Sequence, residues 1–194
     1  MNTPAHLLIG AAAFGKSADQ RILVAAFAGG LMPDLSLYLM AGVSLYILGI
    51  PPSVVFNDLY FSGAWQTVFA IDNSFFVWGV LCAIAVWRKS GWAIALTGAA
   101  LVHLALDFPL HHDDGRPHFW PFSYWVFESP VSYWDRSHGA ALVAPIEASI
   151  ATVAAVVLWR RALPVWGSGL VVLLLLAEFW VVRQWLFFFV DSPG

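Results

Sequence analysis

The residues with the clearest chemical meaning in this sequence are His103 and Asp107, which lie four positions apart in an apolar stretch. On an α-helix this spacing puts the imidazole and the carboxylate on one face. The pair could supply two ligands to one metal ion, or one ligand and the carboxylate that orients it. Pro109 ends the helix, and His111 continues the same spacing by one turn. We expect His111 or its neighbour His112 to shuttle protons at the rim of such a site.

Ionisable residues also occur in the other apolar stretches, where they are costly unless they face the interior of a helix bundle. Most of them lie 13 to 18 residues from the nearest basic residue at the end of the same stretch. At 1.5 Å of rise per residue, this places them about 20–27 Å from that end. We therefore predict one polar chamber lined by seven side chains, namely His6, Asp34, Asp72, His103, Asp107, Glu147 and Glu178.

The carboxylates at this level need a source of positive charge, because we expect no lysine or arginine at that depth. Protons or a metal ion could supply it. The predicted metal ligands are His6, Asp34, His103 and Asp107. Asp72 would be a further ligand or the general base. For Glu147 and Glu178 we favour a simpler interpretation, a hydrogen bond between neighbouring helices.

The donor set narrows the choice of metal. It combines carboxylates and imidazoles without a thiolate, and the single cysteine excludes a CxxC site. Such a set suits a divalent ion, with Zn²⁺ first and Mn²⁺ or Fe²⁺ as alternatives. The sequence also lacks the HExxH, GxSxG and phosphate-binding glycine motifs. Zincin proteases, serine hydrolases and nucleotide-binding folds are therefore not supported.

Membrane helices must position these side chains. Of the 194 residues, 60% are hydrophobic and 11% are charged, against roughly 25% charged in an average soluble domain. A helix needs roughly 20 apolar residues to cross a bilayer. Suitable runs cover residues 22–50, 64–87, 92–110, 139–159 and 165–182, and a shorter run covers 4–14. We predict an all-α, polytopic transmembrane bundle of about six helices, the first one short, forming a single domain over residues 1–194.

Two apolar runs contain polar or helix-breaking residues. In the run 22–50, Pro33 follows a glycine pair and precedes Asp34, which predicts a broken helix with Asp34 facing the chamber. Irregular backbone at membrane depth is tolerated where it lines a cavity. In the run 64–87, Asp72 is followed by Asn73 and Ser74, which could orient Asp72 or bind substrate.

Basic residues orient the predicted bundle. Six of the nine lysine and arginine residues lie in three short connections, as Lys16, Arg21, Arg88, Lys89, Arg160 and Arg161. The positive-inside rule makes this end cytoplasmic. The long segment 111–138, rich in histidine and aromatic residues, would form a lid or mouth at the periplasmic end. With 12 acidic and 9 basic groups, the chain offers no basic surface for a nucleic acid.

Three segments occur in order along the first two thirds of the chain: TPAHLLIG at 3–10, GLMPD at 30–34, and HLALD at 103–107 leading to WPFS at 120–123. Together they resemble the bacterial inner-membrane metal-dependent hydrolase family, which includes LexA-binding, inner-membrane-associated hydrolases. The resemblance implies a helical hydrolase of the bacterial inner membrane with a metal bound by His6, Asp34, His103 and Asp107. The family usually has a His-Ser pair where this chain has Asn73 and Ser74. Either Asp72 replaces that imidazole or one metal position is lost.

We expect a membrane-embedded hydrolase in which a metal-activated water attacks an ester or phosphoester from the periplasmic side. Its partners would be the lipid bilayer and a lipid-like substrate, whose entry the aromatic segment 119–134 would gate. Two alternatives stay open. A proton or cation transporter would use the same acidic layer. An accessory subunit of a larger membrane complex would carry a vestigial site and bind its partner through residues 185–190.

Overall fold

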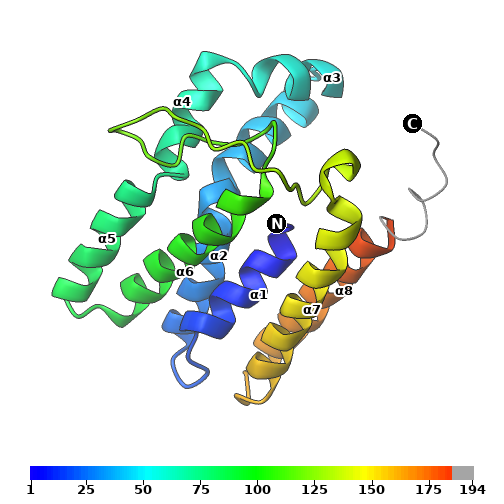
Figure 1. The fold of residues 1–194 in the computed structure, drawn as a ribbon. Coiled ribbons are helices and arrows are strands. Elements are labelled where there is room, and N and C mark those ends of the chain that lie inside the picture. The colour runs from blue at the N-terminus through cyan, green and yellow to red at the C-terminus, as the bar shows by residue number, and fades with distance from the viewer. Residues whose placement is uncertain (185–194) are drawn as a thin grey trace.

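The computed structural model describes residues 1–184, and the expected docking segment 185–190 lies outside them. The long helices are α1 (Thr3–Phe14), α2 (Gln20–Gly42), α4 (Gly63–Asp72), α5 (Phe75–Trp87), α6 (Gly91–Asp107), α7 (Ala140–Trp159) and α8 (Val165–Arg183). Shorter helical segments extend or link them: η1 (Val43–Ile47), α3 (Pro52–Val54), η2 (Val55–Leu59), η3 (Phe108–Leu110) and η4 (Arg136–His138). The predicted all-α class is confirmed (Figure 1).

Within residues 1–184, five helical segments are long and apolar enough to cross a membrane. They cover Gln20–Ile47, Gly63–Trp87, Gly91–Leu110, Ala140–Trp159 and Val165–Arg183. Helix α1 has 12 residues and is therefore about 18 Å long, too short to cross a bilayer. Figure 1 shows α1 in the middle of the bundle, where it contacts α2 and α6 on one side and α7 and α8 on the other. The chain is a multi-pass membrane protein built around a short central helix.

The connections between the helices separate into two ends (Figure 1). The α1–α2, α5–α6 and α7–α8 connections lie at one end. They carry five of the six basic residues named above, and the sixth, Arg21, lies in the first turn of α2. The long segment 111–138 lies at the other end. It is bonded to the start of α5, where the backbone N–H of Phe75 donates to the carbonyl oxygen of His118 at 3.0 Å. The charge asymmetry of the sequence is thus also an asymmetry of the fold.

Helix α2 is continuous through Pro33, so the predicted break in it is wrong. The glycine pair instead lets neighbouring helices approach. A β-carbon on Gly29 would lie 2.1 Å from the carbonyl oxygen of Leu96 in α6. One on Gly30 would lie 2.7 Å from the carbonyl oxygen of His6 in α1. Packing on both sides therefore holds α2 in helical form, although Pro33 removes one hydrogen-bond donor from it.

The interruption lies instead at Asn73 and Ser74, between α4 and α5, whereas the run 64–87 predicts one helix. Ser74 begins α5, because its hydroxyl accepts from the backbone N–H groups of Phe76 and Val77 at 3.2 Å each. The same hydroxyl donates to the carbonyl oxygen of Trp120 in the long segment. Polar residues within an apolar run thus serve to attach the long segment to the helices.

One added methyl group at Gly29 or Gly30 should destabilise the bundle, because each β-carbon would meet the backbone of a neighbouring helix. We expect Gly29→Ala and Gly30→Ala each to lower the free energy of unfolding by about 1–3 kcal/mol. Thermal unfolding in detergent measures this. Gly42→Ala is the matched control, since nothing lies within 4 Å of its β-carbon. Equal midpoints for all three variants would contradict the close approach of α1, α2 and α6.

Candidate metal centre

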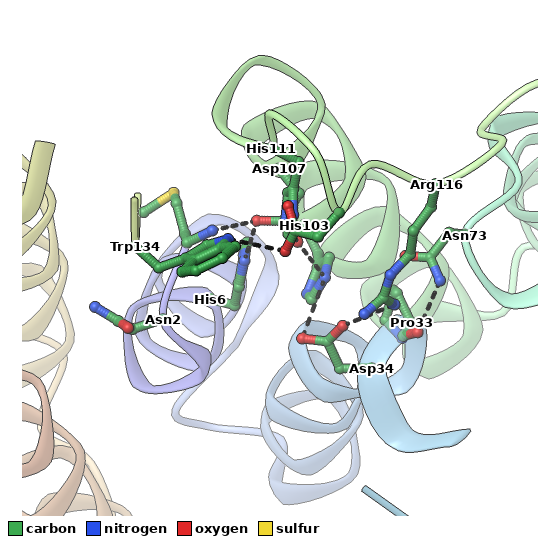
Figure 2. Close-up of polar contacts among 12 residues, drawn as sticks. Asn2, His6, Pro33, Asp34, Asn73, His103, Asp107, His111, Arg116 and Trp134 are labelled. Carbon is green, nitrogen blue, oxygen red and sulfur yellow. Dashed lines mark hydrogen bonds and ion pairs between the residues drawn. The ribbon is translucent and has the colours of Figure 1, made fainter. Parts of the chain in front are cut away.

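His6 of α1 and His103 and Asp107 of α6 meet in the interior of the bundle (Figure 2). All three are buried, and one ligand-type atom from each lies within 4.8 Å of the others. The Nε2 atom of His6 lies 2.8 Å from Oδ1 of Asp107. The Nε2 atom of His103 lies 3.2 Å from Oδ2 of Asp107. Three of the four predicted ligands are thus brought together, although His6 and Asp107 are 101 positions apart in the chain.

The tautomer of His103 follows from its contact with the backbone of α2. Its Nδ1 atom lies 2.8 Å from the carbonyl oxygen of Gly30, which can only accept, so Nδ1 carries the proton. In the neutral ring Nε2 then presents a lone pair, and it has no hydrogen-bond partner. It faces Asp107 at 3.2 Å and Oδ2 of Asp34 at 3.7 Å. A lone pair facing two carboxylates is unfavourable unless a proton or a cation lies among them.

These residues could hold a divalent metal ion. Imidazole and carboxylate are ordinary ligands of Zn²⁺, and two tetrahedral ligands at about 2.1 Å from the ion lie about 3.4 Å from each other. The separation of 3.2 Å between His103 and Asp107 is close to that value, whereas the 2.8 Å between His6 and Asp107 is a hydrogen-bond distance. The bond from His103 to the Gly30 carbonyl is the outer contact that metal-binding histidines commonly make. The types of these side chains and their proximity would therefore allow them to hold a metal ion.

Asp34, the fourth predicted ligand, lies beside this cluster and pairs with an arginine. Its Oδ1 atom accepts from Nη1 of Arg116 at 3.2 Å, and its other oxygen faces His103 (Figure 2). Arg116 comes from the long segment and is 6% exposed. The prediction that no arginine reaches this level is therefore wrong. Counting residues along the apolar runs cannot show that a connecting segment folds back into the bundle.

Two further groups lie next to the carboxylate of Asp107. The amino group of Met1 lies 2.5 Å from Oδ1, and Nε2 of His111 lies 3.4 Å from Oδ2. On its other side, Nδ1 of His111 lies 2.8 Å from Oδ1 of Asp114. Burial disfavours a charged imidazole here, but the two carboxylates outweigh burial and raise the pKa of His111. His111 thus connects a buried carboxylate to one nearer the surface, where a proton shuttle would have to lie.

Two predicted catalytic residues are not brought to the cluster. Asp72 ends α4 with its side chain beside Ser36 of α2. His112 lies in the long segment, with Nδ1 2.8 Å from the carbonyl oxygen of Ser129 and its ring stacked on His138 at 3.6 Å. Position in the sequence predicts the depth of a residue on a helix. It does not predict the direction in which the side chain points, which is why Asp72 was misplaced. His112 lies beyond the helix, where its contacts are set by the path of the long segment.

Glu147 of α7 and Glu178 of α8 are 2% and 0% exposed. Both turn toward Asn2 at the start of α1. Oε1 of Glu147 accepts from the backbone N–H of Asn2, and Oε1 of Glu178 accepts from its Nδ2 atom at 3.4 Å. The expected hydrogen bonding between helices is found, and both glutamates bond to Asn2. It attaches the α7–α8 pair to the central helix, next to the His–Asp cluster.

Two adjoining cavities lead to the cluster from the end that carries the long segment. The smaller, of about 120 Å³, is bordered by Asp34 and Asp107, and the larger is about 460 Å³. Both cavities share four lining residues, Leu37, His111, Arg116 and Tyr133. Sequence reasoning missed Arg116 and Tyr133, because a residue in a connecting segment carries no periodic signal that indicates burial. The shared residues mark the route by which a ligand could reach the cluster.

Comparison with known proteins adds no assignment. No protein-family model, no curated protein and no solved structure matches this chain. The function must therefore be inferred from the residues of the site and from the three sequence segments described above.

The long segment should make the fold sensitive to acid through His118. This residue is 4% exposed between Phe75 and Phe108, and burial lowers its pKa from 6.5 to about 4. Between these values the unfolded chain binds a proton that the folded chain does not, so stability falls as the pH falls. We expect a loss of about 2 kcal/mol between pH 7 and pH 5. Thermal unfolding at the two pH values measures this loss of stability. The His118→Gln variant should lose less stability than the unmodified protein between pH 7 and pH 5, and an equal loss in both proteins would contradict the interpretation.

Proposed function

We propose that this protein is a membrane-embedded, metal-dependent hydrolase acting on an ester or phosphoester. The observation that carries the proposal is the Nε2 atom of His103, which is buried without a hydrogen bond and faces the carboxylates of Asp107 and Asp34 at 3.2 and 3.7 Å. His6, His103 and Asp107 supply imidazole and carboxylate donors within 4.8 Å of one another, and Asp107 borders a cavity. Imidazole and carboxylate are ordinary ligands of a divalent ion. The resemblance of three segments to the inner-membrane metal-dependent hydrolase family supports the same proposal.

His6, His103 and Asp107 would hold the ion, and Asp34 would complete the set through the oxygen that faces His103. When bound, Zn²⁺, or alternatively Mn²⁺ or Fe²⁺, would supply Lewis-acid activation of a water molecule and of the substrate. The Gly30 carbonyl keeps His103 in the tautomer that ligation through Nε2 requires. The stacking of the two imidazoles, with centroids 3.7 Å apart, holds both rings in place.

His111 is the residue best placed to move protons. Its ring bridges Asp107 and Asp114 at the border of the smaller cavity. In hydrolysis the water oxygen bonds to the carbon or phosphorus of the ester, and the bond to the alcohol oxygen breaks. His111 would accept the proton that the water loses and deliver it to the departing alcohol. Asp114 would hold the ring in position through its bond to Nδ1.

Asn73 supports a site for one ion. It occupies the position of a family histidine, but its Nδ2 atom donates to the carbonyl oxygens of Pro33 and Phe69, at 3.2 and 3.1 Å. The backbone carbonyl oxygen of Asn73 lies 2.8 Å from Nδ1 of His118. Asn73 therefore holds α2 in place next to Asp34. We infer that the chain has given up one ligand position and kept the centre formed by α1, α2 and α6.

The proposed location is the bacterial inner membrane, with the cavities open to the periplasmic side. The basic connections lie at the end of the bundle opposite the long segment (Figure 1). Under the positive-inside rule that end would face the cytoplasm. A substrate would then arrive from the periplasm or from the outer leaflet of the membrane.

The metal proposal predicts about one divalent ion per purified chain, measured by inductively coupled plasma mass spectrometry. His103→Ala and Asp107→Asn each remove a ligand, so both variants should lose most of the metal. They should also lose the rise in unfolding temperature that added Zn²⁺ gives the unmodified protein.

Two variants serve as controls for that measurement. His138→Ala removes a histidine that pairs with Asp135 in the long segment, so the metal content should not change. Asp72→Asn should likewise retain its metal, because Asp72 lies beside Ser36. Unmodified protein that is free of metal, and whose unfolding temperature does not respond to Zn²⁺, would overturn the proposed function.

A further inference from the structure

Arg116 has hydrogen-bonding capacity that its pairing with Asp34 does not use. Its side chain is buried, Nη1 donates one hydrogen bond to Asp34, and Nε has no partner. A guanidinium carries five N–H donors and commonly holds an anion through two parallel bonds. A buried donor without a partner costs free energy. The arrangement is therefore suited to a ligand that completes the hydrogen bonds of the guanidinium.

The guanidinium lies between the His–Asp cluster and the larger cavity. The ring of Phe69 lies 4.8 Å from its central carbon, and the hydroxyl of Tyr60 interacts with it from the side. Figure 2 shows the side chain entering from the long segment and pointing toward Asp34. Arg116 lines both cavities, so a ligand that extends from the larger cavity to the cluster can meet it.

The larger cavity offers an apolar wall next to this cation. Phe56, Phe61 and Trp134 line it and remain 46%, 56% and 40% exposed. Partly exposed aromatic rings at the end of a membrane bundle suit an acyl or alkyl group. A molecule with an anionic head and an apolar tail could therefore place its head at Arg116 and its tail against these rings.

We propose that Arg116 binds the phosphoryl group of the substrate, so that the site takes phosphate esters in preference to neutral carboxylic esters. This inference rests on the proposed metal-dependent hydrolysis. A phosphate ester has anionic oxygens on more than one side of the phosphorus, so one can meet the guanidinium while another faces the cluster. A carboxylic ester has no anionic oxygen to offer. The carboxylates of Asp34, Asp107 and Asp114 repel an anion, so binding should require the divalent ion.

Calorimetry on the full chain in detergent, loaded with Zn²⁺, tests this with two probes, glycerol 3-phosphate and dihexanoyl phosphatidic acid. Arg116→Lys keeps a positive charge beside Asp34 but loses the planar guanidinium that can donate two parallel hydrogen bonds. It should weaken the binding of phosphate probes by about tenfold or more at unchanged zinc content. Arg136→Lys is the matched control, since Arg136 is exposed in η4, and it should bind as the unmodified protein does. Dihexanoylglycerol, which lacks the phosphate, should bind at least about tenfold more weakly than phosphatidic acid.

A second pair of variants distinguishes the two sources of the phosphoryl group. Phe61→Ala removes an aromatic ring from the lining of the larger cavity and leaves Arg116 unchanged. Phe122→Ala is its control, because the ring of Phe122 lies outside this cavity and is 78% exposed. If Phe61→Ala weakens only the binding of phosphatidic acid, the group belongs to a lipid headgroup. If both probes bind equally and Phe61→Ala changes neither, the ligand is a soluble phosphate ester. Both results support the assignment to Arg116.

Zinc-loaded protein that binds neither probe would overturn this inference and leave the metal centre standing. The inference would also be overturned if the Arg116→Lys variant bound the phosphate probes as tightly as the unmodified protein. The same holds if the protein still bound these probes after its metal had been removed. A failure of the unmodified protein to bind metal would instead overturn the proposed function. The two proposals can therefore fail separately.

Discussion

The burial of Asp107 is the constraint on which the rest of this structure depends. A carboxylate inside a membrane bundle is costly unless cationic or hydrogen-bonding groups surround it. Here the neighbours are His6 from α1, His103 and His111 from α6 and the segment after it, and the amino group of Met1. This requirement explains the central position of α1, which is too short to cross a bilayer alone.

The long segment after α6 completes the environment that the helices begin. It carries Arg116 to Asp34 and Asp114 to His111, and it is bonded at Asn73 and Ser74 to the break between α4 and α5. These contacts are polar bonds in a low-dielectric setting, where satisfied networks specify one arrangement strongly. The segment that closes one end of the bundle also supplies its buried cation. Stability and the chemistry of the site therefore depend on the same residues.

Much of this could be predicted from patterns along the chain. The apolar runs predict the membrane helices to within a few residues, because length and apolar composition alone decide whether a helix can cross a bilayer. The four-residue spacing of His103 and Asp107 predicts a shared face, which the structure has. The effect of Pro33 could not be predicted, since packing through Gly29 and Gly30 outweighs the local preference of a proline to interrupt α2.

The sequence by itself determined the helical class and the end at which the basic residues gather, and it indicated six of the ionisable side chains that are buried, Asp72 being only partly so. The tertiary structure alone decided which of those residues face one another. His6, His103 and Asp107 converge while Asp72 turns away, and Arg116 arrives from a segment with no periodic pattern. The reason is physical: hydropathy and helical rise set depth along one axis. Rotation about that axis and the path of a connecting segment are set by packing against the other helices.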